Sequence, residues 1–183
     1  LWFEESNYKT LGSQIKCNPA IKKESDRDAI RRAVVDGRIS ILATDHAPHT
    51  WEEKQETYFN APSGLPLIQH SLLLMLEMCR QNCFSPELIV ERACHAPARL
   101  FQVEDRGFLR EGDWADLVVV NPAEETSVQN SQLFSKCGWS PFLYNVFSNR
   151  IDLTIVSGQI AYQSGMPYLT NRGERVAFSA NRR

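Results

Sequence analysis

An apolar run at residues 38–44, RISILAT, ends directly on a polar stretch and places the strongest constraint on the fold. The run is rich in Ile, Leu and Ala without clean alternation, which is typical of a strand buried on both faces, as parallel strands are. A short strand candidate at 14–17 (QIKC) and a helix pattern from Ser25 to Gly37 precede it. Strand, helix and strand in this order form a βαβ unit, so the sequence predicts an α/β fold.

Several stretches carry helix signals. Ser25 is a candidate N-cap with Asp28 three residues later, and apolar residues recur at helical spacing until Gly37. Residues 67–82 are apolar on nearly every side, which predicts a helix sandwiched between layers. Ser85 before Pro86 predicts a helix start, with a helix running toward Cys94, and residues 96–101 are a further helix candidate. The polar residues 45–66 form a loop of about twenty residues, and loops of that length are usually functional.

The pattern changes near residue 105, where helix signals give way to short strands and turns. Residues 116–122 (DLVVVNP) form a β-rich run that Asn-Pro ends. Residues 151–156 and 159–162 flank Ser157-Gly158, as strands flank the turn of a β-hairpin. We therefore expect two parts, residues 1–104 with the α/β pattern and residues 105–183 with an all-β pattern and a tail.

Composition excludes several classes of protein. The formal net charge is −2 and basic residues are scattered among acidic ones, so no basic surface for nucleic acid is expected. The longest unbroken apolar run, at 72–76, is far shorter than the ~20 residues of a membrane-spanning helix. No signal peptide is visible. Five dispersed cysteines without a CxxC pair favour reduced thiols and a cytoplasmic location.

Asp45 follows the predicted strand at 38–44 directly and is the leading candidate for chemistry. In an α/β barrel, side chains at the carboxyl ends of strands face a common mouth where active sites lie. An acid at this position binds a metal, acts as a general base or caps the next turn, and spacing alone leaves these alternatives open. One carboxylate cannot hold a catalytic metal alone, because such sites need about three protein ligands. Signatures of dinucleotide, P-loop, zincin and serine-hydrolase sites are absent from the sequence.

The histidines carry weaker signals. His46 would point away from Asp45 on an extended backbone, so we interpret it as a structural histidine or as one that supports a ligand residue without binding the metal itself. His49 lies in a Pro-containing loop and could turn back toward the mouth. His70 and His95 lie in helical patterns and are expected to be buried with partners or exposed, rather than metal ligands.

Four stretches resemble the C-terminal part of dihydroorotases, which belong to the amidohydrolase superfamily: KCNPAIK at 16–22, DGRISILATDHAPHTWEEK at 36–54, APARLFQVEDRGFLREGDWADLVVVNP at 96–122 and SPFLYNVFSNRIDLTIVSGQIAY at 140–162. Together they cover almost the whole chain. The TDHAPH segment with an upstream K-x-N-P is rather specific for dihydroorotases. The ADLVVVNP and SGQIAY segments are shared by hydantoinases, allantoinases and related cyclic amidohydrolases.

The resemblance implies the C-terminal part of a TIM-type (β/α)8 barrel with two metal ions, usually zinc, followed by strands of a small β-sandwich. On this interpretation residues 14–17 and 39–44 are the last two barrel strands. Asp45 matches the aspartate that binds a metal in the family and takes a proton from the bridging hydroxide, which attacks the cyclic amide. It then delivers the proton to the departing ring nitrogen. The implied reaction is the reversible hydrolysis of dihydroorotate to N-carbamoyl-aspartate in pyrimidine biosynthesis.

The resemblance also implies the substrate contacts. Asn18 and His49 match the family's contacts to the substrate carboxylate, and Ser63 and Gly64 match a loop whose backbone meets the pyrimidine ring. The sequence departs from the family at NPAIK, where NPPLR is usual, at Ser63, where Phe is frequent, and at Ala96, where Asn often stands. None of these departures removes an atom from the implied chemistry.

The remaining metal ligands of the family are an HxH pair, a carboxylated lysine and two more histidines, and the resemblance puts them upstream of Leu1. The chain begins LWFEESNYKT without Met, and a barrel alone needs ~250 residues, so we expect a fragment. Activity is expected only of the complete protein, with the missing N-terminal part as the main partner and a homodimer as a candidate assembly.

Three alternatives remain open. The chain could belong to another cyclic amidohydrolase, acting on hydantoins, dihydropyrimidines or allantoin. It could belong to a non-catalytic amidohydrolase-like assembly subunit, since fold does not fix function. It could also be a β-rich binding module in which Asp45 only caps a loop.

Overall fold

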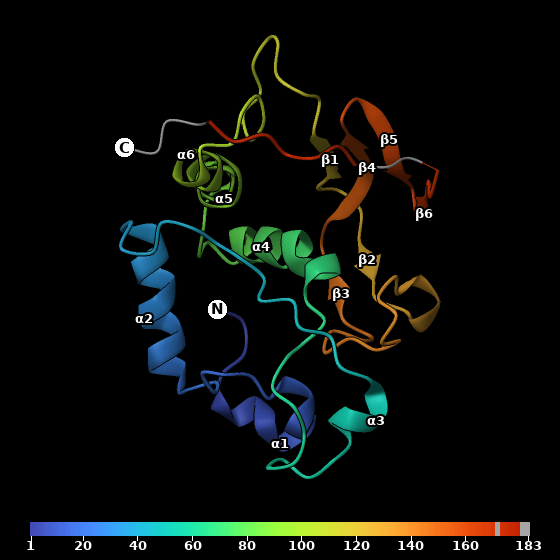
Figure 1. Cartoon of the computed structure of the whole chain (residues 1–183). Helices are drawn as coiled ribbons and strands as arrows, with labels where there is room; N and C mark the ends of the chain where they lie inside the picture. Colours follow the sequence, from blue (N-terminus) through green and yellow to red (C-terminus); the bar gives the residue numbers. More distant parts are fainter. Residues whose placement is uncertain (171–172, 180–183) are drawn as a thin grey trace.

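The computed structural model describes residues 1–170 and 173–179, and helices in its first part are followed by an antiparallel sheet (Figure 1). The helices are α1 Tyr8–Leu11, α2 Glu24–Val35, α3 Trp51–Lys54, α4 Ser71–Arg80, α5 Pro86–Val90 and α6 Ala96–Phe101. The strands are β1 Leu117–Asn121, β2 Thr126–Ser127, β3 Val146–Phe147, β4 Arg150–Val156, β5 Gln159–Gln163 and β6 Met166–Pro167. Short 3-10 turns cover Glu5–Asn7, Gly12–Ile15, Ile68–His70 and Asn130–Gln132.

The helix predicted from Ser25 to Gly37 is confirmed as α2, but its predicted cap is wrong. The N-cap is Lys23, whose backbone N–H donates to the Asp26 carboxylate at 3.1 Å. Asp26 therefore acts as the capping-box acid three residues into the helix, in place of Asp28. Gly37 ends the helix with a φ of 86°, a backbone conformation that favours glycine.

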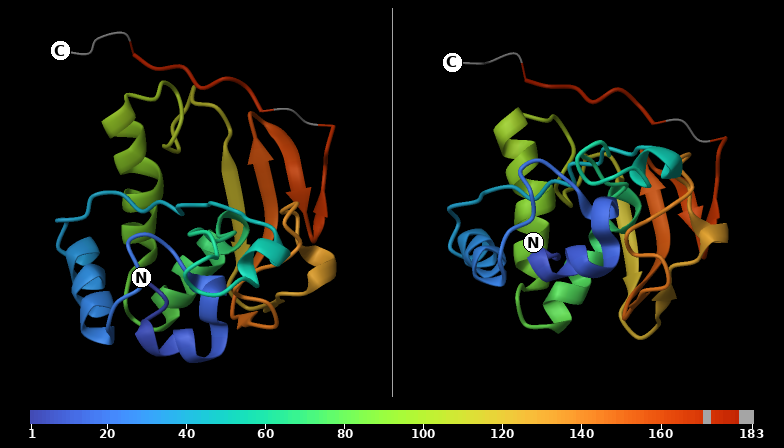
Figure 2. Two further views of the ribbon diagram at one scale, coloured as in Figure 1. Left: turned by 60° about the horizontal axis from the view of Figure 1, so that its bottom comes forward. Right: turned by 90° about the horizontal axis from the view of Figure 1, so that it is seen from below.

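Helix α4 lies between the other helices and the sheet, as its apolar sequence predicts (Figures 1 and 2). Met78 of α4 packs in one buried cluster with Val34 and Ile89. Leu73 of the same helix packs in a second cluster with Val128, Phe142 and Phe147. Because α4 serves both clusters, it connects the helical half of the chain to the β-rich half.

The two helices predicted after Ser85 form one continuous helical rod. The Ser85 hydroxyl accepts from Leu88 N at 3.2 Å and caps α5, as predicted. Between α5 and α6, Glu91–His95 form a π-helical turn, and the helix then continues to Phe101. Pro97 has no N–H for a regular helical bond, and a wider turn allows the helix to pass it without ending.

The main sheet has the strand order β1-β4-β5-β6 and is antiparallel throughout. Ser157 and Gly158, with φ values of 51° and 79°, form the tight turn between β4 and β5. The hairpin predicted at this turn is therefore confirmed, because positive φ at both central residues is what such a turn requires. Strands β2 and β3 form a separate two-stranded sheet.

The two predicted barrel strands do not form strands in the described part of the chain. Residues 12–15 are a 3-10 turn, residues 38–39 are a bend, and residues 40–44 are irregular and have no strand partner. The backbone bonds of the second stretch run from Ile39 N to Ala33 O and from Leu42 N to Arg92 O, both to helices. A parallel strand needs a neighbouring strand to complete its ladder, and no other strand of the described residues lies beside this one.

The boundary predicted at 104/105 stays a prediction, and residues 171–172 and 180–183 of the predicted second part lie outside the described residues. No helix in the described ranges is long and apolar enough to cross a membrane.

Candidate active site

Asp45 directly follows the segment 38–44, and its φ is 49°. It is exposed and lines a cavity of about 320 Å³ whose other walls are mainly apolar, including Leu42, Leu74 and Met75. Asp45 is the one carboxylate in the described lining of this cavity, and its side chain has no hydrogen-bond or ion-pair partner among the described residues. The carboxylate is therefore free to bind a ligand.

Cys17 lies close to Asp45 and lines the same cavity. Burial raises the pKa of the Cys17 thiol above its ordinary value, and the negative charge of Asp45 acts in the same direction. A neutral thiol beside the carboxylate adds no competing charge. Asn18 follows Cys17 and is exposed, so the predicted substrate contact lies on the segment that faces Asp45.

Backbone hydrogen bonds join three segments around this cavity. Gly64 N donates to Lys16 O at 2.9 Å, which connects the 63–65 segment to the 16–18 segment. Ala47 N donates to Leu65 O at 3.0 Å, which connects the same segment to the stretch after Asp45. Residues predicted to serve one site are thus brought together from positions more than forty apart in the sequence.

Gly64 occupies a position that a side chain could not share. Its φ is 144°, and a Cβ there would lie 2.4 Å from the Ala47 carbonyl oxygen and 2.9 Å from His49 Cδ2. Contacts this short do not occur between real atoms, so any substitution displaces one of the two backbones. The close approach explains in physical terms why the loop needs glycine.

His49 contacts the predicted loop rather than the cavity. Its Nε2 lies 3.1 Å from the Ser63 carbonyl oxygen, and its Nδ1 lies 3.8 Å from a carboxylate oxygen of Glu53. Its backbone oxygen accepts from Trp139 Nε1 at 2.7 Å. The structure therefore brings His49, Ser63 and Gly64 into contact, whereas Asn18 and Asp45 are related to them through neighbouring residues.

Lys54 is a residue of the site that sequence reasoning missed. Its side chain is only 1% exposed, and its ammonium lies 2.9 Å from Pro62 O, 3.0 Å from Gly64 O and 3.3 Å from Lys16 O. Lysine is almost never fully buried without partners, so this burial marks a specific role. The only signal in the sequence is its place at the end of the TDHAPHTWEEK stretch.

Two of the other histidines are structural. His46 Nδ1 accepts from Leu67 N at 3.0 Å and from Ile68 N at 3.2 Å, so it caps the 3-10 turn before α4. His95 stacks on Phe108 with ring centroids 4.4 Å apart. The structural interpretation of His46 is thus confirmed.

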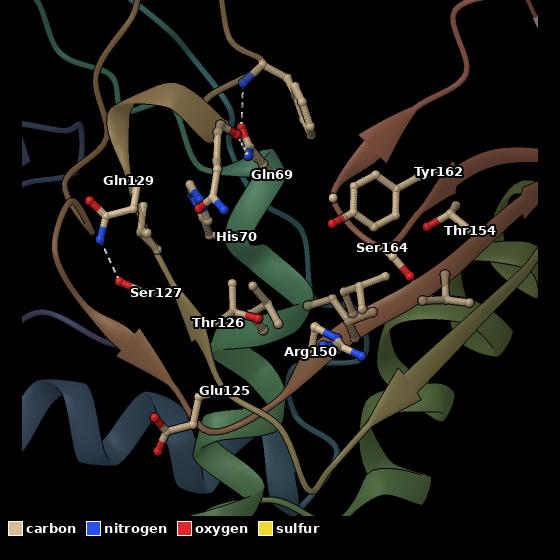
Figure 3. A pocket seen from close by; sticks show the side chains of 18 residues that line it. Gln69, His70, Glu125, Thr126, Ser127, Gln129, Arg150, Thr154, Tyr162 and Ser164 are labelled. Atoms are coloured by element: carbon tan, nitrogen blue, oxygen red, sulfur yellow. Dashed lines mark hydrogen bonds between the residues drawn. The ribbon is translucent and has the colours of Figure 1, made fainter.

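A larger cavity, of about 520 Å³, lies between α4 and the sheet (Figure 3). His70, Gln69, Arg150 and Tyr162 are among the residues that line it, and none of the predicted site residues does. Its wall is mostly uncharged. It is therefore a separate feature of the helix–sheet junction and not part of the candidate active site.

We expect acid to destabilise the fold through His70. The side chain is 4% exposed, and burial lowers the pKa of His70 from 6.5 to about 4. Between pH 6.5 and about 4, His70 binds a proton in the unfolded chain but not in the folded chain. The free energy of unfolding is therefore highest above pH 6.5 and falls as the pH decreases toward about 4. The shift corresponds to a loss of about 3 kcal/mol, which urea unfolding followed by circular dichroism at several pH values measures.

The control for this prediction is His70→Gln, which keeps a polar side chain but cannot titrate in this range. The variant is expected to show a smaller loss of stability between the two pH values than the unchanged chain shows. An equal loss in both chains would assign the acid sensitivity to other groups.

Asp45 is the predicted metal ligand among the described residues, and it lines the cavity. Among them no group of three or more His, Cys, Asp or Glu side chains is placed to hold a metal ion. Asp45 nevertheless fits one ligand position, because its carboxylate is exposed in a cavity and forms no ion pair with the described residues. Any metal at this site therefore needs further ligands in addition to Asp45.

Comparison with known proteins finds similar sequences and folds. The model of the amidohydrolase family matches residues 4–161. Dihydroorotase from Clostridioides difficile is 36% identical over 161 residues, which cover 87% of this chain and 38% of that protein. Dihydroorotase from Halobacterium salinarum is 34% identical over 142 residues, which cover 78% of this chain and 34% of that protein. The chain thus spans less than two fifths of the length of these relatives.

Solved structures give the same picture of the fold. An L-hydantoinase (dihydropyrimidinase) from Arthrobacter aurescens superposes with a TM-score of 0.86 at 26% identity, covering 91% of this chain and 38% of that chain. A D-hydantoinase superposes with a TM-score of 0.82 at 16% identity, which shows the fold alone. The mixed α/β fold therefore matches part of the cyclic amidohydrolase fold. Because the family model matches most of its length, the chain belongs to the amidohydrolase family.

Proposed function

We propose that this chain is the C-terminal part of a metal-dependent dihydroorotase, which reversibly hydrolyses dihydroorotate to N-carbamoyl-aspartate. The observation that carries the proposal is the unpaired Asp45 carboxylate, held at the wall of a cavity by the segment that resembles the dihydroorotase TDHAPH stretch. The similarity to dihydroorotases from several organisms supports this substrate class. Cytoplasmic location and a homodimer stay predictions.

The proposed site needs polypeptide besides these residues. The segment 38–44 has no strand partner in the described part, although its apolar composition suits a strand between two others. We propose that the rest of a (β/α)8 barrel pairs with this segment and brings the remaining metal ligands close to Asp45. The chain together with this further polypeptide is called the complete enzyme below.

In the proposed reaction, Asp45 both binds a metal and moves a proton. A pair of divalent cations, such as zinc, would polarise the amide carbonyl and lower the pKa of water in the site. Asp45 accepts the proton of the attacking water as its oxygen bonds to the carbonyl carbon. The ring C–N bond then breaks, and Asp45 returns the proton to the departing nitrogen. Ring closure is the same sequence in reverse.

The neighbouring segments are proposed to bind the substrate. The Asn18 side chain, exposed beside Cys17, offers an amide donor to the substrate carboxylate. His49 offers a second donor, although its Nε2 contacts Ser63 O in this structure, so the ring would have to exchange that partner for the substrate. Ser63 and Gly64 offer a backbone that can approach a flat ring closely.

A hydantoinase or dihydropyrimidinase is the second candidate, because the Arthrobacter aurescens structure superposes over 91% of this chain. The two candidates differ in the carboxylate on the substrate ring. Dihydroorotate carries one, whereas hydantoin and dihydrouracil do not. The residues proposed to bind it, Asn18 and His49, are therefore what distinguishes the candidates.

The test compares these substrates on the complete enzyme loaded with zinc. We expect kcat/KM for dihydroorotate to exceed that for hydantoin or dihydrouracil at least ~100-fold, since a site built for a charged group rejects analogues that lack it. Opening or closure of the substrate ring is followed by ultraviolet absorbance. Faster turnover of hydantoin or dihydrouracil would assign the chain to the second candidate.

A further inference from the structure

The buried lysine Lys54 connects two segments that carry the proposed substrate contacts. Its ammonium binds Pro62 O and Gly64 O on one segment and Lys16 O on the other, at 2.9, 3.0 and 3.3 Å. An ammonium has three donor hydrogens, and three carbonyl oxygens can use all of them. The three carbonyl oxygens therefore satisfy all the donors of the Lys54 ammonium, which needs no carboxylate as a partner.

The location of Lys54 at the end of α3 explains how its ammonium reaches both segments. The Ser13 hydroxyl donates to the Lys54 backbone oxygen, which fixes the end of the short helix. The centroid of the Trp139 ring lies 6.0 Å from the ammonium. Burial lowers the pKa of Lys54, and the positive charge of Lys16 acts in the same direction. Burial of a cation costs free energy unless the cation is fully hydrogen-bonded, so moving these carbonyl oxygens away from the ammonium would destabilise the fold.

A second lysine makes a similar set of bonds farther out in the loop. Lys16 Nζ lies 2.7 Å from Tyr58 O, 3.3 Å from Phe59 O and 2.6 Å from Ala61 O. Lys16 therefore holds residues 58–61, which precede the segment proposed to meet the substrate. Lys54 instead holds the inner part, at Pro62 and Gly64, next to the residues proposed to meet the substrate.

Resting on the proposed function, we propose that Lys54 is a positioning residue for substrate binding: its buried ammonium fixes the Ser63-Gly64 backbone against the segment that carries Asn18. Lys54 does not touch the substrate and takes no part in proton transfer. Its effect comes from holding both halves of the binding surface at one separation. A small displacement of such groups weakens binding substantially.

The test is Lys54→Met in the complete enzyme, which keeps an unbranched side chain one atom shorter and removes all three donors. We expect KM for dihydroorotate to rise at least about tenfold while kcat stays within about threefold, because Asp45 lies on a different segment. Lys16→Met is the matched control, since it also removes three bonds to loop carbonyls. It is expected to raise KM less than Lys54→Met does.

Amide hydrogen exchange provides a readout that does not depend on substrate. In Lys54→Met the Gly64 N–H, which donates to Lys16 O, is expected to exchange faster than in the unchanged protein. Lys16→Met is expected to speed exchange mainly at residues 58–61. If Lys54→Met does not fold, Lys54→Gln replaces it, since its amide retains two of the three donors. We expect Lys54→Gln to raise KM for dihydroorotate, but by less than the rise of about tenfold expected for Lys54→Met.

The outcomes separate this inference from the proposed function. An unchanged enzyme without dihydroorotase activity would remove the proposed function and leave the Gly64 exchange to decide the role of Lys54 in the loop. Normal dihydroorotase activity with an unchanged KM in Lys54→Met, or in Lys54→Gln where that variant is used, would overturn the inference alone. An equal rise in KM in Lys16→Met and Lys54→Met would also overturn it, because any loosening of the loop would then suffice.

Discussion

Asp45→Asn in the complete enzyme is expected to lower kcat for both dihydroorotate and N-carbamoyl-aspartate by at least ~10³-fold and to leave the fold unchanged. The substitution keeps the shape of the side chain and removes its negative charge and its ability to take a proton. Both directions fail together because the same group accepts the proton in one direction and supplies it in the other. The Asp45 side chain has no partner among the described residues, so the fold does not depend on its charge.

Steady-state kinetics in both directions measure this loss, and thermal unfolding verifies the fold. Glu52→Gln is the matched control, since Glu52 is an exposed acid on α3 outside the proposed chemistry. It is expected to retain kcat. Near-normal turnover in Asp45→Asn would remove Asp45 from the mechanism.

Gly64→Ala is expected to have the second large effect. At a φ of 144°, the added methyl group would lie 2.4 Å from the Ala47 carbonyl oxygen and 2.9 Å from the His49 ring. The loop must therefore move away from the segment that follows Asp45. Overpacking of this kind, together with the unfavourable φ, costs on the order of 3 kcal/mol. We expect a corresponding loss in urea unfolding and a rise in KM of at least about tenfold.

Gly112→Ala separates backbone strain from the close contact. Gly112 also has a positive φ, of 94°, but nothing lies within 4 Å of the Cβ that would be added. Its substitution is expected to cost about 1 kcal/mol and to leave KM unchanged. If Gly64→Ala behaved like Gly112→Ala in both measurements, the close approach at Gly64 would have no role in binding.

The elements that could be predicted from sequence are those whose signals are local. The start of α5 at Ser85, the turn at Ser157-Gly158 and the two-sided burial of α4 depend on residues within one or two turns of each other. The strand predicted at 38–44 does not form in the described part of the chain, because a parallel strand needs neighbouring strands that its own residues do not supply. The π-helical turn that joins α5 to α6 was missed because Pro97 usually indicates a break.

The candidate site could be predicted only in part, for a similar reason. The place of Asp45 after an apolar extended run, and the resemblance of TDHAPH, were visible in the sequence. Lys54 was not, because its burial depends on carbonyls of Lys16, Pro62 and Gly64 that the folded loop brings together. A lysine in the sequence WEEK is otherwise typical of a solvated helix face.

Anomalous diffraction at the zinc edge from crystals of the complete enzyme tests the central claim most directly, since it locates the metal ions relative to Asp45. The account predicts an anomalous peak about 2.0–2.2 Å from an Asp45 carboxylate oxygen, with the other ligands supplied by the polypeptide that completes the barrel. Zinc peaks bound elsewhere, with the Asp45 carboxylate turned into solvent, would contradict it.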